Sequence, residues 1–275
     1  MKSALFIKTK NLGDAVILTA PIAALRDRYR IHVLCFSDCA PIYEGLDGVA
    51  RVWSVKRGER GWASVSNGLK LLYKLRRFRF DLLVQFSDDW RGALLARLLR
   101  VSVSVAHHRN NRPRFWLRSF SILSTITPRR HAVEQDVDLL RRVGLYYGTA
   151  PRYTLPSPVG DSSNAEQIIK SMGLVKKNYI VIHLFSRWPF KQLSPTTCRQ
   201  LILDLNNEGF EILLTGDHDD AEKYRALGLA AMQGVKTAFG NNLGIFISLV
   251  RLSKALISID SFAIHVASAH QIPTL

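Results

Sequence analysis

The alternation of short β-type runs with helix-length amphipathic runs constrains the fold of this chain most strongly, and it occurs in two series. In the first series the pattern predicts strands at residues 4–8, 31–36, 49–55, 81–86 and 101–106, with helices at 15–28, 64–77 and 90–100. In the second it predicts strands at 179–184, 211–215 and 255–259, with helices at 195–208, 220–229, 243–253 and 262–269. Strands that alternate with helices form βαβ units, so we expect an α/β fold built on mostly parallel sheets.

A proline-, glycine- and serine-rich stretch, GTAPRYTLPSPVGDSSNA at 148–165, separates the two series. Such a composition is typical of a linker. We therefore expect an N-terminal Rossmann-like domain at 1–150, a linker at 151–165 and a C-terminal Rossmann-like domain at 166–275, with a cleft between the domains. The second series has few strands before the chain ends at Leu275, so we expect this domain to be incomplete.

The balance of charge points to an anionic partner, because 38 Lys and Arg against 22 Asp and Glu give a net charge of +16. Nucleic acid, an anionic membrane face and a phosphate-bearing substrate all fit this charge. No uncharged apolar run reaches the length of about 18 residues that a transmembrane helix needs. The three cysteines are an odd number in a long chain and do not suggest a disulfide framework.

One acid stands alone at the first strand–helix junction, in IKTKNLGDAVILTAP at 7–21. Ligands of open α/β sheets bind beyond the carboxyl ends of the strands, which is where Asp14 falls. A carboxylate there fits two roles, because it can stabilise the start of a helix or act as a general base on a ligand. The G-x-G-x-x-G dinucleotide pattern is absent from this loop.

The loop after the first strand of the second series, in HLFSRWPFKQLSP at 183–195, carries the cations Arg187 and Lys191. It leads into a helix with Ser194 at the N-cap position and Pro195 at the first helical position. A helix N-terminus with a lysine and an arginine can hold a diphosphate. Two solvated cations on a loop would give the same pattern.

Two more strand ends carry polar residues. In ISIDSFAIHVASA, Asp260 and Ser261 precede a helix that carries His265, and helix capping with a core histidine is the alternative to a ligand site. In LLTGDHDDAE at 213–222, an Asp-x-Asp pair has the spacing of metal ligands, but an acidic helix start also accounts for it. We expect no metal site there.

The stretch from Arg91 to Arg130 contains nine arginines and no Asp, Glu or Lys. Arginine suits bidentate recognition of phosphate, and arginine interleaved with aromatic residues also fits nucleic acid. The segment RPRFWLRSF at 112–120 could also lie on an anionic membrane. No nucleic-acid-binding motif accompanies the stretch.

Four segments in the same order, covering most of the chain, resemble the ADP-heptose:lipopolysaccharide heptosyltransferases, glycosyltransferase family 9. IKTKNLGDAVILTAP resembles that family's first strand–loop–helix, and IVIHLFSRWPFKQLSP resembles its donor-domain strand and lysine loop. ILLTGDHDDAE resembles its T-G-x-x-x-E-type loop, and LISIDSFAIHVASAHQIPT resembles its D-[ST]-x-x-x-H-x-A-x-A-x-x-x-P-T segment.

The resemblance implies a GT-B fold and an inverting transfer of heptose from ADP-heptose to the phosphorylated inner core of lipopolysaccharide, with no metal and no other cofactor. It implies that Asp14 is the general base. The donor site that it implies contains Ser186, Arg187, Lys191, Asp220, Asp260, Ser261 and His265, and the acceptor site contains Lys10, Arg109, Arg112 and Arg114. A transferase for another nucleotide sugar, or a basic nucleic-acid- or membrane-binding protein, is the alternative.

The resemblance also implies a cytoplasmic protein in peripheral contact with the anionic inner membrane, whose acceptor accounts for the positive charge without nucleic acid. Two positions depart from many family members: Leu184-Phe185 replaces Pro-Gly, and Phe262 replaces the glycine after Asp-Ser. Glycine at such positions lets the backbone approach a phosphate. The SRWPFK run is similar to the branch that adds a third heptose.

Overall fold

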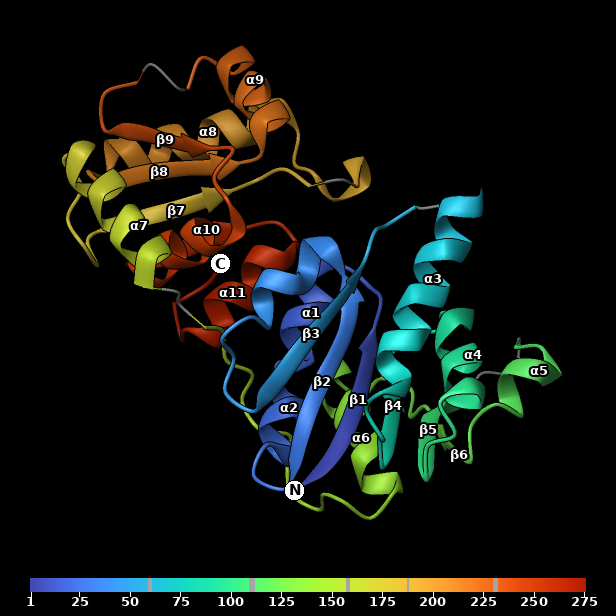
Figure 1. The fold of residues 1–275 in the computed structure, drawn as a ribbon. Coiled ribbons are helices and arrows are strands. Elements are labelled where there is room, and N and C mark those ends of the chain that lie inside the picture. Colours follow the sequence, from blue (N-terminus) through green and yellow to red (C-terminus); the bar gives the residue numbers. More distant parts are fainter. Residues whose placement is uncertain (59–60, 109–111, 157–158, 187, 230–231) are drawn as a thin grey trace. The chain divides into compact units, whose positions relative to one another are not determined.

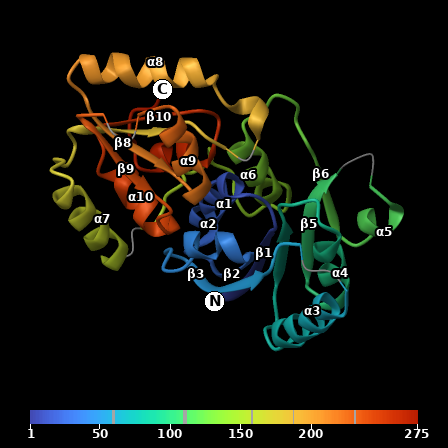
Figure 2. The same cartoon turned by 90° about the horizontal axis from the view of Figure 1, so that it is seen from above.

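The computed structural model describes residues 1–58, 61–108, 112–156, 159–186, 188–229 and 232–275. The chain divides into two compact units, Met1–Pro156 and Ser157–Leu275. Each unit contains its own parallel sheet with helices packed on it (Figure 1, Figure 2). No helix in these described ranges is both long and apolar enough to cross a membrane.

In its described residues the first unit is built on a six-stranded parallel sheet of order β3-β2-β1-β4-β5-β6. Its strands are β1 (Lys2–Lys8), β2 (Tyr29–Phe36), β3 (Val49–Val55), β4 (Leu82–Gln85), β5 (Val103–His108) and β6 (Ile122–Thr125). Its helices are α1 (Leu12–Ile17), α2 (Thr19–Leu25), η1 (Ser37–Ile42), α3 (Gly61–Arg76), α4 (Trp90–Leu98), α5 (Arg114–Leu117) and α6 (Ala132–Arg142). The continuous apolar runs of β1 and β4 suit central strands that are covered on both faces.

Alternate side chains of β1 enter two different packed layers of the first unit. Leu5 and Ile7 pack with Leu75 of α3 and with residues of α4 on one face of the sheet. On the other face α1, α2 and α6 pack together, and Ile17 of α1 is part of their apolar cluster. The carboxyl end of β1 is therefore enclosed by helices from both sides.

In its described residues the second unit has a four-stranded parallel sheet of order β10-β7-β8-β9. Its strands are β7 (Tyr179–His183), β8 (Glu211–Gly216), β9 (Val235–Phe239) and β10 (Ala255–Ser258). Its helices are α7 (Val159–Ser171), η2 (Pro189–Lys191), α8 (Pro195–Asn207), α9 (His218–Ala226), α10 (Leu243–Arg251) and α11 (Phe262–Ala269). The predicted α/β class, with parallel sheets in two successive units, is confirmed.

The structure differs from the predicted elements in the first unit at one long helix. The helix expected at 15–28 is two helices, α1 and α2, that meet at Leu18. Pro21 has no N–H to donate to the carbonyl four residues earlier, so the helical hydrogen-bond ladder is interrupted there. The elements η1, α5, β6, α6, α7, η2 and β9 lie outside the predicted helix and strand ranges.

Residues 159–165, expected to belong to the linker, form the first half of α7. Asp161 and the Ser, Ser and Asn residues that follow it are weak helix formers, which is why the composition suggested a linker. Helix α7 packs against α10, and the Asp161 carboxylate accepts a hydrogen bond from the Asn242 amide at 3.2 Å. Tertiary packing therefore outweighs local propensity in this segment.

Candidate active site

The carboxyl end of β1 holds a buried ion pair. Lys8, the last residue of β1, is 3% exposed, and its Nζ donates to Oδ2 of Asp136 at 2.5 Å. Asp136 lies on α6 among the buried residues Val133, Val137 and Leu140. Burial raises the pKa of the Asp136 carboxyl, and the nearby Lys8 ammonium opposes this rise. A buried ammonium needs an anionic partner, so this pair holds α6 against the end of β1.

Asp14 lies beside this pair in the first turn of α1, whose N-cap residue is Asn11. Its Oδ1 is 4.0 Å from Nζ of Lys8 and 4.0 Å from Nζ of Lys10. The Asp14 side chain is 32% exposed, whereas that of Asp136 is 8% exposed. Of the two carboxylates close to Lys8, Asp14 is the one that a ligand can reach.

The four residues predicted to bind an acceptor have different surroundings. Lys10 lies next to Asp14, and Nη2 of Arg57 donates to its carbonyl oxygen at 3.0 Å. Arg112 lies 3.6 Å from the carboxylate of Asp88, in the loop that follows β4. Arg114 is exposed at the start of the short helix α5, at the β5–β6 side of the sheet (Figure 1). Arg109 lies outside the described residues.

In the second unit, Lys191 and Asp260 meet beyond the ends of β7 and β10. Nζ of Lys191 lies 2.5 Å from Oδ2 of Asp260, and their side chains are 31% and 76% exposed. Ser261 is the N-cap residue of α11, where its hydroxyl accepts from the N–H of Ala263 at 3.2 Å. Lys191 is therefore held beside the start of α11, whereas the sequence hypothesis used the start of the helix that Ser194 caps, which is α8.

The other predicted donor residues differ in how fully their polar atoms are engaged. Ser186 shapes the lysine loop, because its hydroxyl accepts from the N–H of Trp188 at 3.1 Å and its carbonyl accepts from Gln192 at 2.6 Å. His265 is half-buried on α11, one turn after Ser261. Arg187 lies outside the described residues.

Asp220 forms a capping box at the start of α9. Its carboxylate accepts from the N–H of Asp217 at 3.2 Å, and the Asp217 carboxylate accepts from the N–H of Asp220 at 2.9 Å. Lys223 donates to the second oxygen of Asp220 at 2.7 Å. Gly216 is required beside it, because a Cβ there would lie 2.7 Å from that of Asp220. These contacts explain the acidic loop as a helix start.

His183, the last residue of β7, was not among the predicted site residues. Its Nδ1 lies 3.2 Å from the hydroxyl of Thr215, which itself donates to the carbonyl of Ile182 at 3.2 Å. Because that hydroxyl has one proton, it accepts from His183, so Nδ1 carries the proton of the neutral ring. Burial lowers the pKa of His183, and the carboxylates of Asp220 and Asp217 oppose this shift.

The side chains that replace glycine in this chain, those of Phe185 and Phe262, fill space next to His183. The ring of Phe262 lies 5.1 Å from that of Phe246 and 6.4 Å from the imidazole of His183. The N–H of Leu184 donates to the buried hydroxyl of Tyr224 at 3.1 Å, and Phe185 packs on the same tyrosine. The Leu184 N–H is thus directed into the core of the unit.

Residues 69–275 match the family model described as "Glycosyltransferase family 9 (heptosyltransferase)". The chain belongs to glycosyltransferase family 9. It is 26% identical over 274 residues to a lipopolysaccharide heptosyltransferase 3 of Escherichia coli, covering 96% of this chain and 79% of that protein. The protein of the same name from strain K12 is also 26% identical, over 279 residues.

Solved structures of family 9 members have the same fold. A glycosyltransferase family 9 protein from Veillonella parvula superposes with a TM-score of 0.89 at 16% identity, over 99% of this chain and 79% of that one. The ADP-heptose lipopolysaccharide heptosyltransferase II of E. coli superposes with a TM-score of 0.79 at 17% identity, over 100% and 83% of the two chains. The two Rossmann-like units thus make a GT-B fold, as the sequence resemblance predicted.

Sequence reasoning missed Lys8, Asp136 and His183. Asp136 falls on the apolar stripe of a segment with helical spacing, AVEQDVDLLRR, together with Val133, Val137 and Leu140. An acid on the buried face of a helix needs a cationic partner, and that signal could have identified it. Lys8, at the end of an apolar strand, gives the complementary signal.

Proposed function

We propose that this family 9 glycosyltransferase moves heptose from ADP-heptose to the phosphorylated inner core of lipopolysaccharide, with inversion at the sugar's anomeric carbon. One observation carries the proposal: the partly exposed Asp14 carboxylate lies 4.0 Å from two ammonium groups at the carboxyl end of β1. The names of the curated E. coli relatives support heptose as the sugar and lipopolysaccharide as the acceptor.

In the proposed reaction, Asp14 takes the proton of the acceptor hydroxyl. The hydroxyl oxygen forms a bond to the anomeric carbon, while the bond from that carbon to the phosphate oxygen of ADP breaks and its electron pair leaves with ADP. Asp136 cannot act as the base, because it is buried and bonded to Lys8. Lys8 acts as a positioning residue that holds a fixed positive charge beside Asp14.

Lys191 binds the leaving diphosphate in this proposal. Its present partner, Asp260, is 76% exposed, so a diphosphate can displace that carboxylate with little rearrangement. Ser261 and His265, on the helix that begins there, contribute polar groups to the same donor site. Lysine and helix N–H groups supply positive charge to the leaving group, so we propose that no metal or other cofactor takes part.

The acceptor's phosphates account for the excess of positive charge in the chain, and we propose Lys10, Arg112 and Arg114 as their partners. Since such an acceptor is a membrane glycolipid, the protein works at the cytoplasmic face of the inner membrane as a peripheral protein. Nucleic acid is not needed to explain the charge.

Release of ADP tests the proposal. Full-length protein incubated with ADP-heptose and deep-truncated lipopolysaccharide should produce ADP, and heat-inactivated protein should not. A thermal-shift comparison of ADP-heptose, ADP and UDP-sugars separates the donor alternatives, since a ligand that binds the native state raises its melting temperature. UDP-sugars must be included in this comparison, because Phe185 and Phe262 replace glycines at positions where the backbone can approach the donor's phosphates. A shift with UDP-sugars alone would replace ADP-heptose as the donor.

A further inference from the structure

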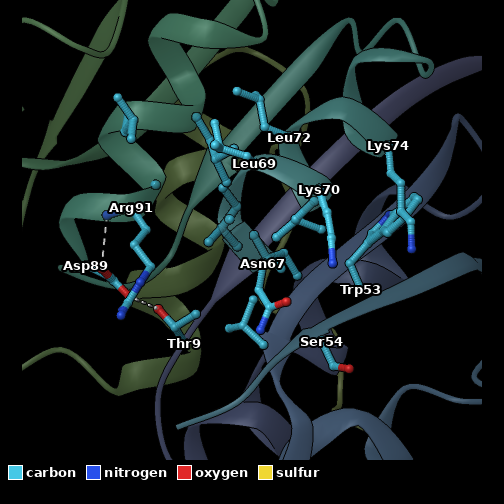
Figure 3. A pocket seen from close by; sticks show the side chains of 18 of the residues that line it. Thr9, Trp53, Ser54, Asn67, Leu69, Lys70, Leu72, Lys74, Asp89 and Arg91 are labelled. Atoms are coloured by element: carbon cyan, nitrogen blue, oxygen red, sulfur yellow. Dashed lines mark hydrogen bonds and ion pairs between the residues drawn. The ribbon is translucent and has the colours of Figure 1, made fainter. Parts of the chain in front are cut away.

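A hollow of about 1260 Å³ lies in the first unit between α3, α4 and the ends of β1, β2 and β3 (Figure 3). Two rows of apolar side chains line it: Val65, Leu69 and Leu72 from α3, and Trp90, Leu94 and Leu98 from α4. We call this hollow and its rim the α3–α4 groove. It exceeds the ~300–1,000 Å³ that is usual for small-ligand sites.

The apolar side chains of the α3–α4 groove remain open to solvent. Val65 and Leu69 of α3 line the hollow and are 55% and 62% exposed; Tyr73, four residues after Leu69, is 62% exposed and continues the same side of the helix beyond the lining residues. On α4, Trp90 is 59% exposed and Leu94, four residues later, is 37% exposed. Residues at this spacing share one side of a helix, so each helix presents a continuous apolar stripe. An exposed patch of this kind marks a surface that binds a partner or a membrane.

Cations surround the apolar stripes. The residues that line the hollow include Arg51, Lys56, Lys70, Lys74 and Arg91. Figure 3 shows the last three. Asp89 is the acid among the described lining residues, and its carboxylate is 3.0 Å from the Arg91 guanidinium. The sequences of α3 and α4 contain neither Asp nor Glu. An apolar stripe bordered by lysine and arginine is the pattern of helices that lie in the headgroup region of an anionic bilayer.

In the segment 112–120, which the sequence suggested for membrane contact, two of the three aromatic side chains are turned inward, whereas Phe115 is 46% exposed. Trp116 and Phe120 are 2% and 7% exposed, and their rings lie 4.9 Å apart. More of the exposed large apolar side chains of the first unit therefore lie on α3 and α4, which carry Val65, Leu69, Tyr73, Trp90 and Leu94, than on that segment, which carries Phe115.

We propose that the α3–α4 groove docks the protein on a bilayer that contains anionic phospholipid. The acyl chains lie against the two apolar stripes, and the lipid phosphates meet Lys70, Lys74 and Arg91. This inference deepens the membrane contact of the proposed function, on which it rests for the choice of membrane. Aliphatic side chains prevail over aromatic ones in the stripes, which favours acyl chains over stacked nucleic-acid bases.

Vesicle flotation of the full-length protein tests the inference. The protein should float with phosphatidylcholine vesicles containing about one-third phosphatidylglycerol, and much less with phosphatidylcholine alone. Leu69→Glu should lower the partition coefficient about tenfold or more, because a leucine that enters the bilayer on binding is replaced by a charge. Val175→Glu is the matched control, since Val175 is 64% exposed in the second unit and should float like the wild type.

The charged rim is tested in the same assay. Lys70→Ala should lower the partition coefficient about fivefold, and added salt should reduce the difference. Lys170→Ala, which removes an exposed lysine of α7, should leave flotation unchanged. The melting temperature of each variant shows whether it is folded.

A fluorescence measurement gives a second readout. Trp90 should shift to shorter emission wavelength when the protein binds phosphatidylglycerol vesicles, and Trp90→Phe should reduce that shift. Trp188→Phe, at an exposed position of the second unit, is the control. Equal flotation of Leu69→Glu and Val175→Glu, or a wild type that binds RNA and ignores both vesicles, would overturn the inference. Flotation uses neither donor nor acceptor, so it can fail while ADP release succeeds.

Discussion

Lys8 and His183 hold the same place in the two units, because each ends the first strand of its unit and each strand has a neighbour on both sides. Lys8 is bonded to the Asp136 carboxylate, which α6 supplies. His183 instead meets the Thr215 hydroxyl and the rings of Phe246 and Phe262, and burial lowers its pKa. The two strand ends therefore differ in what packs against them: a carboxylate faces the Lys8 side chain, and a hydroxyl and aromatic rings face His183.

The accessible cation of the second unit is found elsewhere, on the loop after β7. Lys191 pairs with a carboxylate that is 76% exposed, whereas the partner of Lys8 is 8% exposed. A buried pair is held permanently, and an exposed pair can exchange its anion for a ligand. The first unit thus has a fixed positive charge beside the partly exposed carboxylate of Asp14, and the second has a cation that can exchange its carboxylate for a phosphate.

Breaking the buried pair should have the largest effect on stability. Lys8→Met leaves Asp136 buried without its cation, so we expect the free energy of unfolding to fall by about 3–5 kcal/mol. Urea denaturation of the purified variant measures this. The double variant Lys8→Met/Asp136→Leu should recover much of the loss, because no buried charge then lacks a partner. A single variant as stable as the wild type would show that the pair is not a structural anchor.

Asp14→Asn should show that the partly exposed carboxylate of Asp14 acts in catalysis, in contrast to the structural role of the buried Asp136. The amide cannot take a proton at neutral pH, so we expect turnover to fall by about 10²- to 10⁴-fold. Initial rates of ADP release measure it, and the melting temperature and ADP affinity should stay near those of the wild type. Unchanged turnover with lower stability would instead assign Asp14 to the start of α1.

Lys191→Ala tests whether Lys191 exchanges the Asp260 carboxylate for the diphosphate of ADP. Loss of a charge-assisted hydrogen bond to phosphate should weaken ADP binding by about 1.5–3 kcal/mol, which is roughly 10- to 150-fold in Kd. Calorimetric titration with ADP measures this. Lys176→Ala is the matched control, because Lys176 also forms an exposed ion pair, with Glu166 at 2.8 Å. Equal affinities of the two variants would remove Lys191 from the donor site.

The sequence predicted most of the fold because strand–helix alternation is a local signal. The strand expected at 49–55 and the helix expected at 262–269 match β3 and α11. Segments fixed by distant contacts were missed, as α7 shows: its polar first turns are helical because they pack on α10. Propensity is summed along the chain and contains no information about such a partner.

In the candidate site, too, the sequence located the residues that belong to local motifs and missed the contacts between distant residues. Motif order placed Asp14, Lys191 and Asp260 at strand ends, where the structure has them. The pairing of Lys8 with Asp136 joins residues 128 positions apart, and no spacing rule reaches that far. The inward packing of Trp116 was likewise invisible, because an aromatic residue among arginines has the same local pattern whether it faces solvent or the core.

The smallest expected effect concerns the neutral base at the end of β7. The folded state takes up a proton on His183 less readily, because burial lowers its pKa, whereas the unfolded chain takes up a proton near pH 6.5. Stability is therefore lost as the pH falls below about 6.5, by at most ~1.4 kcal/mol per pH unit for one histidine.

The variant His183→Gln tests this pH dependence. It removes the titration of His183, and its side-chain amide can still donate to Thr215. Between pH 7 and pH 5.5 the wild type should lose about 1 kcal/mol more unfolding free energy than the variant. The pKa values of His32 and His270, lowered by burial to about 4, affect both proteins equally and cancel in the difference. Identical pH profiles would mean that His183 gains a proton in the folded state and that the two strand ends do not differ in charge.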